Sequence, residues 1–483
     1  MTGANGYETV IGLEVHAQLK TETKIFCGCR SAYGAEPNSL TCPTCLGLPG
    51  ALPVLNQQAV VCAARAVLAL DGTVNPESRF ARKSYFYPDL PKGYQITQYE
   101  HPLAVGGEVR YPGRNGTRKS CRLTRIHLEE DAGKSIHPER GQLHTRLDFN
   151  RCGVPLIEIV SESDIRSPED AYGYLLTLKQ ILQYADVCAG DMEKGQLRVD
   201  ANVSVRVAGA DATATRTEIK NLNSFKAVRR AIAFEVRRQI GVTESGGKVD
   251  RATLFWDESA QAAKIMRTKE QSPDYRYLAE PDLAPLVLSE EWIEEIRRQL
   301  PELPEVRAGR FVKQYGIGDH DAAVLTQSRG LADYFEAVVR DFPDGRTASN
   351  WIQTRLLGYL NDSRVEIENC PVTPDQMAGL LSAVRTGRIS AATAVDVFRQ
   401  MLTTGNDFQS IIEEQGLVLI EDESVIGRII DEVLAGNPEN VAAFKAGKSA
   451  LLTFFVGQVM RNSGGQADPQ VVRRILIEKL EAG

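Results

Sequence analysis

The sequence has no hydrophobic run long enough to cross a membrane. Its longest apolar stretches, such as residues 451–456, fall well short of the roughly 20 residues that a membrane-spanning helix needs. No charged start followed by an apolar segment marks an export signal either. We therefore expect a cytoplasmic protein without a membrane part, whose nine cysteines are reduced thiols, metal ligands or core residues.

The familiar nucleotide-binding and hydrolase motifs are also missing. Residues 133–135 and 447–449 each read Gly-Lys-Ser, like the end of a phosphate-binding loop, but Leu128 and Ala442 occupy the position of the required first glycine. No G-x-S-x-G nucleophile, H-E-x-x-H helix or dinucleotide fingerprint occurs. If the protein uses ATP, its pocket is therefore of another kind.

An excess of positive charge is absent as well. The formal net charge is −7, and neutralisation of phosphates by Lys and Arg supplies most non-specific affinity for nucleic acids. A protein that coats nucleic acid is thus excluded, and any RNA site must be local. The chain does have 483 residues, 43% of them hydrophobic, which is enough for two to four domains with sizeable cores.

The patterning divides the chain into three parts and predicts the α+β class. In residues 1–290, apolar and polar residues alternate between frequent Gly and Pro, which is typical of half-buried strands in antiparallel sheets. Helix-length segments with short breaks then predict an all-helical domain over 291–405 and a second one over 406–483. The second half of the last part is basic, and its cations either contact RNA phosphates or form a solvated surface. These cations are Lys445, Lys448, Arg461, Arg473 and Arg474.

Two close pairs of cysteines stand twelve residues apart near the N-terminus. Cys27 and Cys29 form the first pair, and Cys42 and Cys45 form the second. Two such knuckles can deliver four thiolates to one tetrahedral zinc ion, and a closed site of this kind is structural because no position remains for substrate. The alternative is four unmetallated thiols, which is also our interpretation of the other, scattered cysteines.

Polar residues recur at every second position in several apolar segments. In residues 11–19 every odd position is apolar, so that on a strand Glu14 and His16 project together from the opposite face. The same alternation over 197–207 aligns Asp200 and Asn202. A third segment aligns Arg216, Glu218 and Lys220. Solvent exposure alone would also explain each of these strands.

Glu158 resists that explanation because it stands alone in the apolar segment 154–160, where a buried carboxylate needs a partner. In the acidic segment 127–131, Glu129 and Glu130 should point to opposite faces of a strand, so that one of them can join Glu158. Carboxylates with an imidazole suit a magnesium ion that assists phosphoryl transfer. A network of buried ion pairs is the competing interpretation.

Aromatic and cationic residues are interleaved in residues 79–89, and Lys92, Tyr94 and Tyr99 follow. Such a surface can stack an unpaired nucleotide base and hold its phosphate. The aromatics can equally belong to the core.

Eight motifs follow one another along the chain. They are ETVIGLEVH at 8–16, RKSYFYPD at 82–89, HLEEDAGKS at 127–135, PLIEIVSE at 155–162, DANVS at 200–204, KNLNSF at 220–225, DYRY at 274–277 and VGQVM at 456–460. In this order they resemble the B-subunit family of the bacterial and organellar aspartyl/glutamyl-tRNA(Asn/Gln) amidotransferases, the GatB family. The resemblance covers essentially the whole chain and implies a catalytic cradle domain, a helical domain and a tail domain.

The resemblance also implies a reaction and partners. Proteins of this family use ATP and Mg²⁺ to phosphorylate the side-chain carboxylate of Glu-tRNA(Gln) or Asp-tRNA(Asn). Ammonia, which a separate amidase subunit releases from glutamine, passes through a channel and displaces the phosphate. A third, small subunit completes the heterotrimer. An acyl phosphate is needed because a carboxylate is a poor electrophile.

By position within the matching motifs, the resemblance places four side chains around the magnesium ion and adds further catalytic candidates. The four are Glu14, His16, Glu130 and Glu158, with His16, Glu130 and Glu158 as ligands, and the further candidates are Glu129, Asp200, Asn202 and Lys220. The four paired cysteines fit a zinc-bearing member of the family. Because family members bind the tRNA body with their helical and tail domains, the basic residues after 440 become tRNA candidates.

Two other functions remain open at this stage. One is a non-catalytic tRNA-binding scaffold, which the missing phosphate-binding loop favours and the clustered carboxylates weaken. The other is a stand-alone ATP-dependent ligase for a small molecule, which would need its own source of ammonia. The sequence shows no glutaminase nucleophile.

Overall fold

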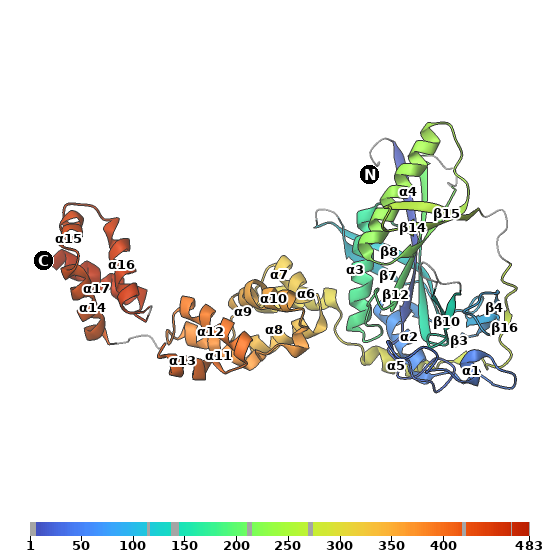
Figure 1. Cartoon of the computed structure of the whole chain (residues 1–483), viewed down its shortest axis with the longest axis horizontal. Helices are drawn as coiled ribbons and strands as arrows, with labels where there is room; N and C mark the ends of the chain where they lie inside the picture. The colour runs from blue at the N-terminus through green and yellow to red at the C-terminus, as the bar shows by residue number, and fades with distance from the viewer. Residues whose placement is uncertain are drawn as a thin grey trace. The chain divides into compact units, whose positions relative to one another are not determined.

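The computed structural model describes residues 6–113, 116–136, 144–209, 215–268, 274–417, 422–464 and 466–482. The chain divides into two compact units, Met1–Pro304 and Glu305–Gly483. The first unit holds the strands and the second is helical (Figure 1). The predicted α+β class is therefore confirmed.

A ten-stranded sheet forms the body of the first unit, in the order β15-β14-β13-β12-β1-β11-β8-β6-β2, with β7 paired to β8. Strand β1 is antiparallel to both of its neighbours, whereas β13 and β14 run parallel. The long strands are β1 (Tyr7–Gln18), β8 (Arg118–Glu130), β11 (Pro155–Ser161), β12 (Leu197–Val207), β13 (Thr217–Leu222), β14 (Ala252–Asp257) and β15 (Ala262–Thr268). The short ones are β2 (Thr73–Val74), β6 (Ala104–Val105) and β7 (Glu108–Pro112).

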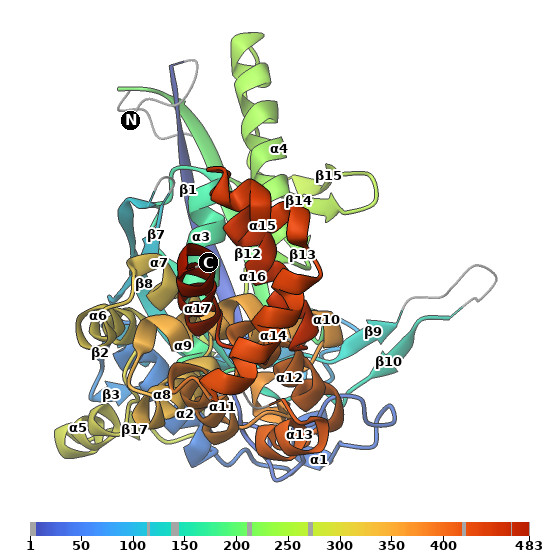
Figure 2. The same ribbon diagram turned by 90° about the vertical axis from the view of Figure 1, so that its left-hand side faces the viewer.

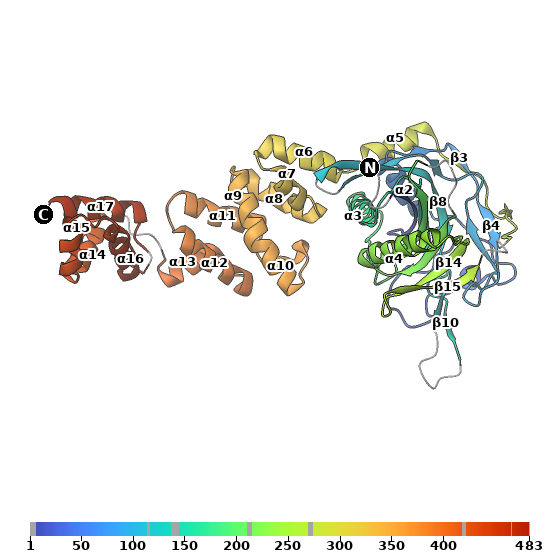
Figure 3. The same cartoon turned by 90° about the horizontal axis from the view of Figure 1, so that it is seen from above.

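One face of this sheet is apolar and carries helices. On β1, Ile11, Leu13 and Val15 are buried, while Glu14 and His16 lie half-buried on the other face, so the predicted alternation is confirmed. Helices α2 (Gln57–Ala69), α3 (Pro168–Tyr184) and α4 (Phe225–Glu244) contribute to the same core. Figures 1 and 3 show α3 and α4 against one face of the sheet. The opposite, polar face of the sheet is the one that carries Glu14 and His16.

Among the described residues, three smaller sheets complete the first unit, one of which packs beside the end of β8. The three-stranded sheet has the order β16-β4-β5, in which β4 (Ala81–Ser84) pairs with β5 (Tyr94–Thr97) and β16 (Leu278–Ala279). A hydrogen bond ties it to the end of β8, because the Gln95 side chain donates to the carbonyl of Glu130 at 2.7 Å. Two further pairs are β3 (Glu77–Ser78) with β17 (Leu286–Val287), and β9 (Lys134–Ile136) with β10 (Arg146–Asp148). Of the second cysteine pair, Cys45 lies on the short helix α1 (Pro43–Leu46) and Cys42 is its N-cap residue.

Helix α5 (Glu290–Arg298) begins where the sequence pattern becomes helical, yet its Ile296 is buried in the core of the first unit. The second unit contains two apolar cores, one formed from residues between Phe311 and Ile412 and the other from residues between Ile426 and Leu480.

Figure 2 labels the α-helices of these two cores. Those of the former are α6 (Pro304–Tyr315), α7 (Asp319–Leu325), α8 (Arg329–Asp341), α9 (Gly345–Trp351), η2 (Ile352–Leu356), α10 (Leu357–Ser363), η3 (Ile367–Asn369), α11 (Pro374–Arg385), α12 (Ala391–Thr404) and α13 (Phe408–Gln415). Those of the latter are α14 (Glu423–Ala435), α15 (Pro438–Lys445), α16 (Leu451–Asn462) and α17 (Pro469–Ala482). Among the residues described, no helix is both long and apolar enough to cross a membrane.

Candidate functional site

A row of polar side chains crosses three neighbouring strands of the large sheet. His16 on β1 lies opposite Glu158 on β11, and Glu158 lies opposite His127 on β8. Glu129 stands two residues beyond His127 and therefore projects from the same face of β8. Antiparallel pairing of β1, β11 and β8 thus gathers residues that are far apart in the sequence.

The side chains of this row lie close enough together to pair with one another or to share an ion. The His16 Nε2 atom is 3.4 Å from Glu129 Oε1 and 3.5 Å from Glu158 Oε2. The possible ligand atoms of these three residues all lie within 4.8 Å of one another. The His127 Nε2 atom is 3.3 Å from Glu158 Oε2, and its Nδ1 is buried without a hydrogen-bond partner. We call His16, Glu129 and Glu158 the carboxylate–histidine cluster.

The charges in this cluster hold one another in place. Burial disfavours the charged form of Glu158 and by itself would raise its pKa. The hydrogen bonds from His127 and, to a smaller extent, from His16 outweigh burial and hold the pKa of Glu158 well below its usual range. Burial by itself would lower the pKa of His127, but its hydrogen bonds to Glu129 and Glu158 raise that pKa to about 9. The pKa of Glu129 is lowered chiefly by His127, against burial. Two anionic carboxylates in a half-buried site are the groups that a hard cation prefers.

Glu130 does not join the cluster, although the sequence led us to expect it as a ligand beside His16 and Glu158. Its carboxylate accepts from the backbone N–H of Ile96 at 2.8 Å and pairs with the buried Lys92 ammonium. Burial raises the pKa of Glu130 despite that cation. The physical reason is the strand itself, because consecutive residues of β8 point to opposite faces and Glu129 takes the position facing His16.

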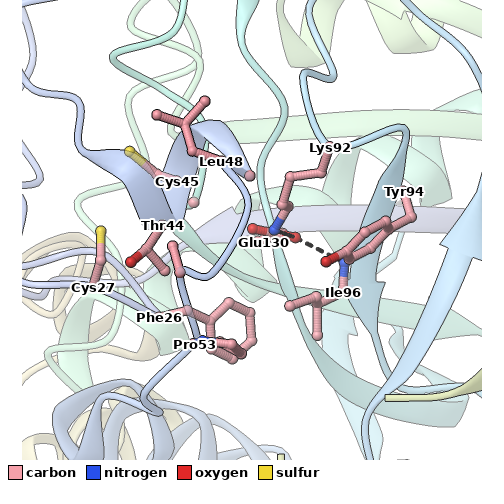
Figure 4. A pocket seen from close by; sticks show the side chains of 13 residues that line it. Phe26, Cys27, Thr44, Cys45, Leu48, Pro53, Lys92, Tyr94, Ile96 and Glu130 are labelled. Atoms are coloured by element: carbon pink, nitrogen blue, oxygen red, sulfur yellow. Dashed lines mark hydrogen bonds and ion pairs between the residues drawn. The ribbon is translucent and has the colours of Figure 1, made fainter. Parts of the chain in front are cut away.

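Glu130 and Lys92 instead line a separate cavity of about 100 Å³. Figure 4 shows them on one side of it, with Cys27 and Cys45 on another. The two neighbouring glutamates of β8 therefore lie in different surroundings, Glu129 in the cluster and Glu130 at the cavity.

A second acidic group flanks the first on the same face. Glu14 lies opposite Asp200 on β12, and ligand atoms of Glu14, Asp200 and Glu218 all lie within 4.8 Å of one another. The Lys220 ammonium contacts Asp200 and is 2.9 Å from Glu218 Oε1, and both charges raise its pKa in spite of burial. The Asn202 amide donates to Glu14 Oε1 at 3.0 Å. Burial and the charge of Glu158 raise the pKa of Glu14.

The four paired cysteines also come together. The sulfur atoms of Cys27, Cys29, Cys42 and Cys45 all lie within 4.8 Å of one another. The ammonium of Lys24, whose side chain is fully buried, is 3.6 Å from the Cys45 sulfur. A hydrogen bond from Cys27 holds the pKa of Cys45 at about 4, against burial, and Lys24 assists. Cys45 is thus the member that favours the thiolate, the form that binds zinc, whereas the bond to Cys45 raises the pKa of Cys27 and burial raises that of Cys29 to about 11.

Known proteins resemble this chain over both of its units. The family described as GatB/GatE catalytic domain matches residues 9–294, and that described as GatB domain matches residues 333–480. The B subunit of the aspartyl/glutamyl-tRNA(Asn/Gln) amidotransferase of Moorella thermoacetica is 50% identical over 475 residues, which are 98% of this chain and 100% of that protein. The chain belongs to the GatB family. The proteins of the same name from Thermodesulfovibrio yellowstonii and Geotalea daltonii are 48% and 50% identical, each over 98% of this chain and 99% of its own length.

The GatB catalytic region, residues 9–294, contains the whole polar face and the cysteine group. Two residues of that face, His127 and Glu218, were not among the sequence-based site candidates. Each stands two positions from a candidate, His127 before Glu129 and Glu218 before Lys220. The alternation of a strand is therefore the signal that points to them.

The GatB domain at residues 333–480 contains the basic residues that we predicted to contact tRNA. All five are exposed, at or after the end of α15 and on α16 and α17. Arg474 is ion-paired with Glu423 and Glu478. Its charge is therefore partly compensated within the fold, whereas the other four present theirs to solvent.

Proposed function

We propose that this chain is the ATP- and Mg²⁺-using component of a tRNA-dependent amidotransferase, acting in the cytoplasm on Glu-tRNA(Gln) or Asp-tRNA(Asn). The observation that carries the proposal is the carboxylate–histidine cluster, in which three ligand atoms lie within 4.8 Å of one another on a polar sheet face. Relatives about half identical over their whole length bear the name of that enzyme's B subunit.

The reaction has two steps. A side-chain carboxylate oxygen of the misacylated amino acid bonds to the γ-phosphorus of ATP while the bond to the bridging oxygen breaks, which gives an acyl phosphate and ADP. The nitrogen of ammonia then bonds to the acyl carbon, and phosphate leaves with a proton from the ammonia. The products are the amide and inorganic phosphate.

The residues of the cluster fit a magnesium ion, with His16, Glu129 and Glu158 as the ligands that this chain supplies. When bound, Mg²⁺ would neutralise charge on the transferring phosphoryl group. Lys220, held between Asp200 and Glu218, offers a fixed cation beside the same face. The Asn202 amide orients Glu14, and His127 orients Glu129 and Glu158. Such supporting bonds set ligand geometry.

We assign the cysteine group to a structural zinc ion. Four sulfur ligands leave no open position, and the segment from Cys27 to Cys45 contains little regular structure of its own apart from α1. Zinc would therefore contribute to folding of this segment and not to the chemistry.

The proposal includes partners. We propose that the ammonia comes from glutamine hydrolysis by an amidase partner, with a small third protein in the complex. We propose that four exposed cations contact tRNA phosphates, with a smaller contribution from Arg474. They are Lys445, Lys448, Arg461 and Arg473. Because such contacts release counterions, tRNA affinity should fall steeply as salt rises.

The test reconstitutes the chain with the amidase and the small subunit, and measures ATP- and glutamine-dependent amidation of both misacylated tRNAs. The Glu158→Gln variant should lose amidation by at least about a thousandfold, since it removes an anionic ligand worth several kcal/mol, while glutamine hydrolysis persists. Glu193→Gln, at an exposed glutamate outside the site, is the matched control. Full amidation by Glu158→Gln would reject the site and favour a tRNA-binding scaffold.

A further inference from the structure

Four tyrosines form a continuous row beside the three-stranded sheet. The rings of Tyr99 and Tyr277 stack with centroids 4.0 Å apart and an interplanar angle of 6°. Tyr275 meets Tyr277 edge-on at 6.1 Å and Tyr85 edge-on at 6.1 Å. The row draws on three segments, following β4, following β5 and preceding β16, and the backbone N–H of Ser84 donates to the carbonyl of Tyr275 at 2.8 Å.

Cations stand at both ends of this row. The Arg125 guanidinium lies 5.7 Å from the centroid of the Tyr99 ring. At the other end, the Lys83 ammonium lies 4.8 Å from the Tyr275 ring and 6.0 Å from the Tyr85 ring. Aromatic faces flanked by cations attract groups that combine a flat π system with negative charge.

The row adjoins the carboxylate–histidine cluster. Thr97, two residues before Tyr99, donates to Glu129 Oε2 at 3.3 Å. Arg125 lies opposite Val160, which is two residues beyond Glu158 on β11. The charge of Glu158 also contributes, after burial and the neighbouring tyrosines, to a pKa of about 12 at Tyr277. A molecule lying on the tyrosine row would thus have its other end near the proposed metal ligands.

The parallel pair Tyr99–Tyr277 differs from other aromatic pairs of this unit, which meet edge-on. Tyr111 and Tyr174 meet at 88°, Phe26 and Phe80 at 84°, and the row's own pairs Tyr85–Tyr275 and Tyr275–Tyr277 at 75° and 67°. Tyr99 and Tyr277 are instead parallel, and Tyr99 is 44% exposed whereas Tyr174 is fully buried. A parallel, partly exposed ring pair is the arrangement on which a nucleobase stacks.

We propose that the tyrosine row is a stacking surface for adenine, with Arg125, at the end nearer the carboxylate–histidine cluster, facing the phosphates of the same ligand. This inference rests on the proposed function, since both of its substrates carry adenine. One is ATP, and the other is the aminoacyl-tRNA, whose 3′-terminal nucleotide is adenosine. The two sources share the chemistry of the base, and steady-state kinetics separates them.

The kinetic test uses the full complex with Tyr99→Leu and Tyr277→Leu. Each variant should raise one KM about tenfold, in line with the contribution of a base–aromatic stack, and Phe at the same position should restore it. A rise in the KM for ATP at saturating aminoacyl-tRNA assigns the row to ATP, and a rise in the KM for aminoacyl-tRNA at saturating ATP assigns it to the tRNA end.

Tyr172→Leu is the matched control, because Tyr172 on α3 also carries an arginine, Arg229, at 5.5 Å from its ring. Its KM values should stay at those of the unchanged complex. Unchanged values of both constants in Tyr99→Leu and Tyr277→Leu would overturn the proposal.

A binding experiment tests the row without any turnover. Fluorescence of 2-aminopurine riboside triphosphate, and of tRNA ending in 2-aminopurine, is followed on titration with the complex. One probe should be quenched by the unchanged complex and by Tyr99→Phe, and much less by Tyr99→Leu. Equal quenching by the Leu and Phe variants would reject stacking. Because this readout needs no amidation, its failure is distinct from failure of the proposed function.

Discussion

The cysteine group and the carboxylate–histidine cluster each bring their possible ligand atoms within 4.8 Å of one another, but they draw on very different lengths of chain. The four cysteines lie between positions 27 and 45, whereas the other cluster joins positions 16, 129 and 158. A short loop can close around its own ligands. The second cluster exists only because β11 pairs with both β1 and β8.

The two groups of side chains should therefore depend differently on their metal ions. The cysteine group should need the ion for its stability, because metal ligation contributes directly to the folding of such a segment. The carboxylate–histidine cluster is held by a large sheet whose apolar face is buried, so its geometry should persist without metal. Loss of metal should therefore affect stability at one site and chemistry at the other.

The largest expected effect compares the two neighbouring glutamates of β8. Glu129→Gln should lower amidation about a thousandfold and raise the Mg²⁺ concentration required, because it removes a ligand. Glu130→Gln should leave the Mg²⁺ requirement unchanged but destabilise the fold by about 3–5 kcal/mol, because the buried Lys92 loses its partner. Activity titrated against Mg²⁺, together with thermal unfolding, separates the two. A raised Mg²⁺ requirement in Glu130→Gln alone would reverse our placement of the ligands.

The next effect tests the cysteine group. Cys42→Ser combined with Cys45→Ser should abolish bound zinc and lower the unfolding temperature, by several degrees for a loss of about 2–3 kcal/mol. Zinc content of the purified complex and calorimetry measure this. Cys370→Ser, at a half-buried cysteine of the second unit, should keep both values. Zinc-free protein with normal stability would contradict a structural ion.

His127 provides a smaller and more specific effect. It contacts two ligands without belonging to the cluster, so His127→Gln should raise the Mg²⁺ concentration for half-maximal activity about 10–100-fold. At saturating Mg²⁺ the kcat should largely recover, which a general loss of folding would not allow. A low kcat that no Mg²⁺ concentration restores would assign His127 to the reaction itself.

The smallest effect concerns Asn202, whose amide donates a single hydrogen bond to Glu14. Asn202→Ala should lower kcat/KM about fivefold, since a single hydrogen bond contributes roughly 1 kcal/mol. Ser204→Ala, two residues further along β12, should have no comparable effect because the Ser204 hydroxyl donates to the backbone carbonyl of Val10. Equal losses in both variants would indicate damage to the strand and not to the site.

Much of the polar face follows from alternation alone. The period of two in residues 11–19 predicts that Glu14 and His16 share a face, and the structure agrees. Alternation also states that only one of Glu129 and Glu130 can meet Glu158. It does not say which one, because that depends on how β8 is registered against β11 and on which face the helices cover.

By itself, the sequence determined the local features: the spacing of the cysteine pairs, the faces of the strands, the change from sheet to helix and the ordered motifs of the GatB family. These depend on residues close together in the chain. The tertiary structure alone decided that Glu129 faces His16 while Glu130 faces Lys92, and that Tyr99 stacks on Tyr277. The physical reason is that a strand's register and a sheet's order are set by burial of the whole apolar face, which no short segment encodes.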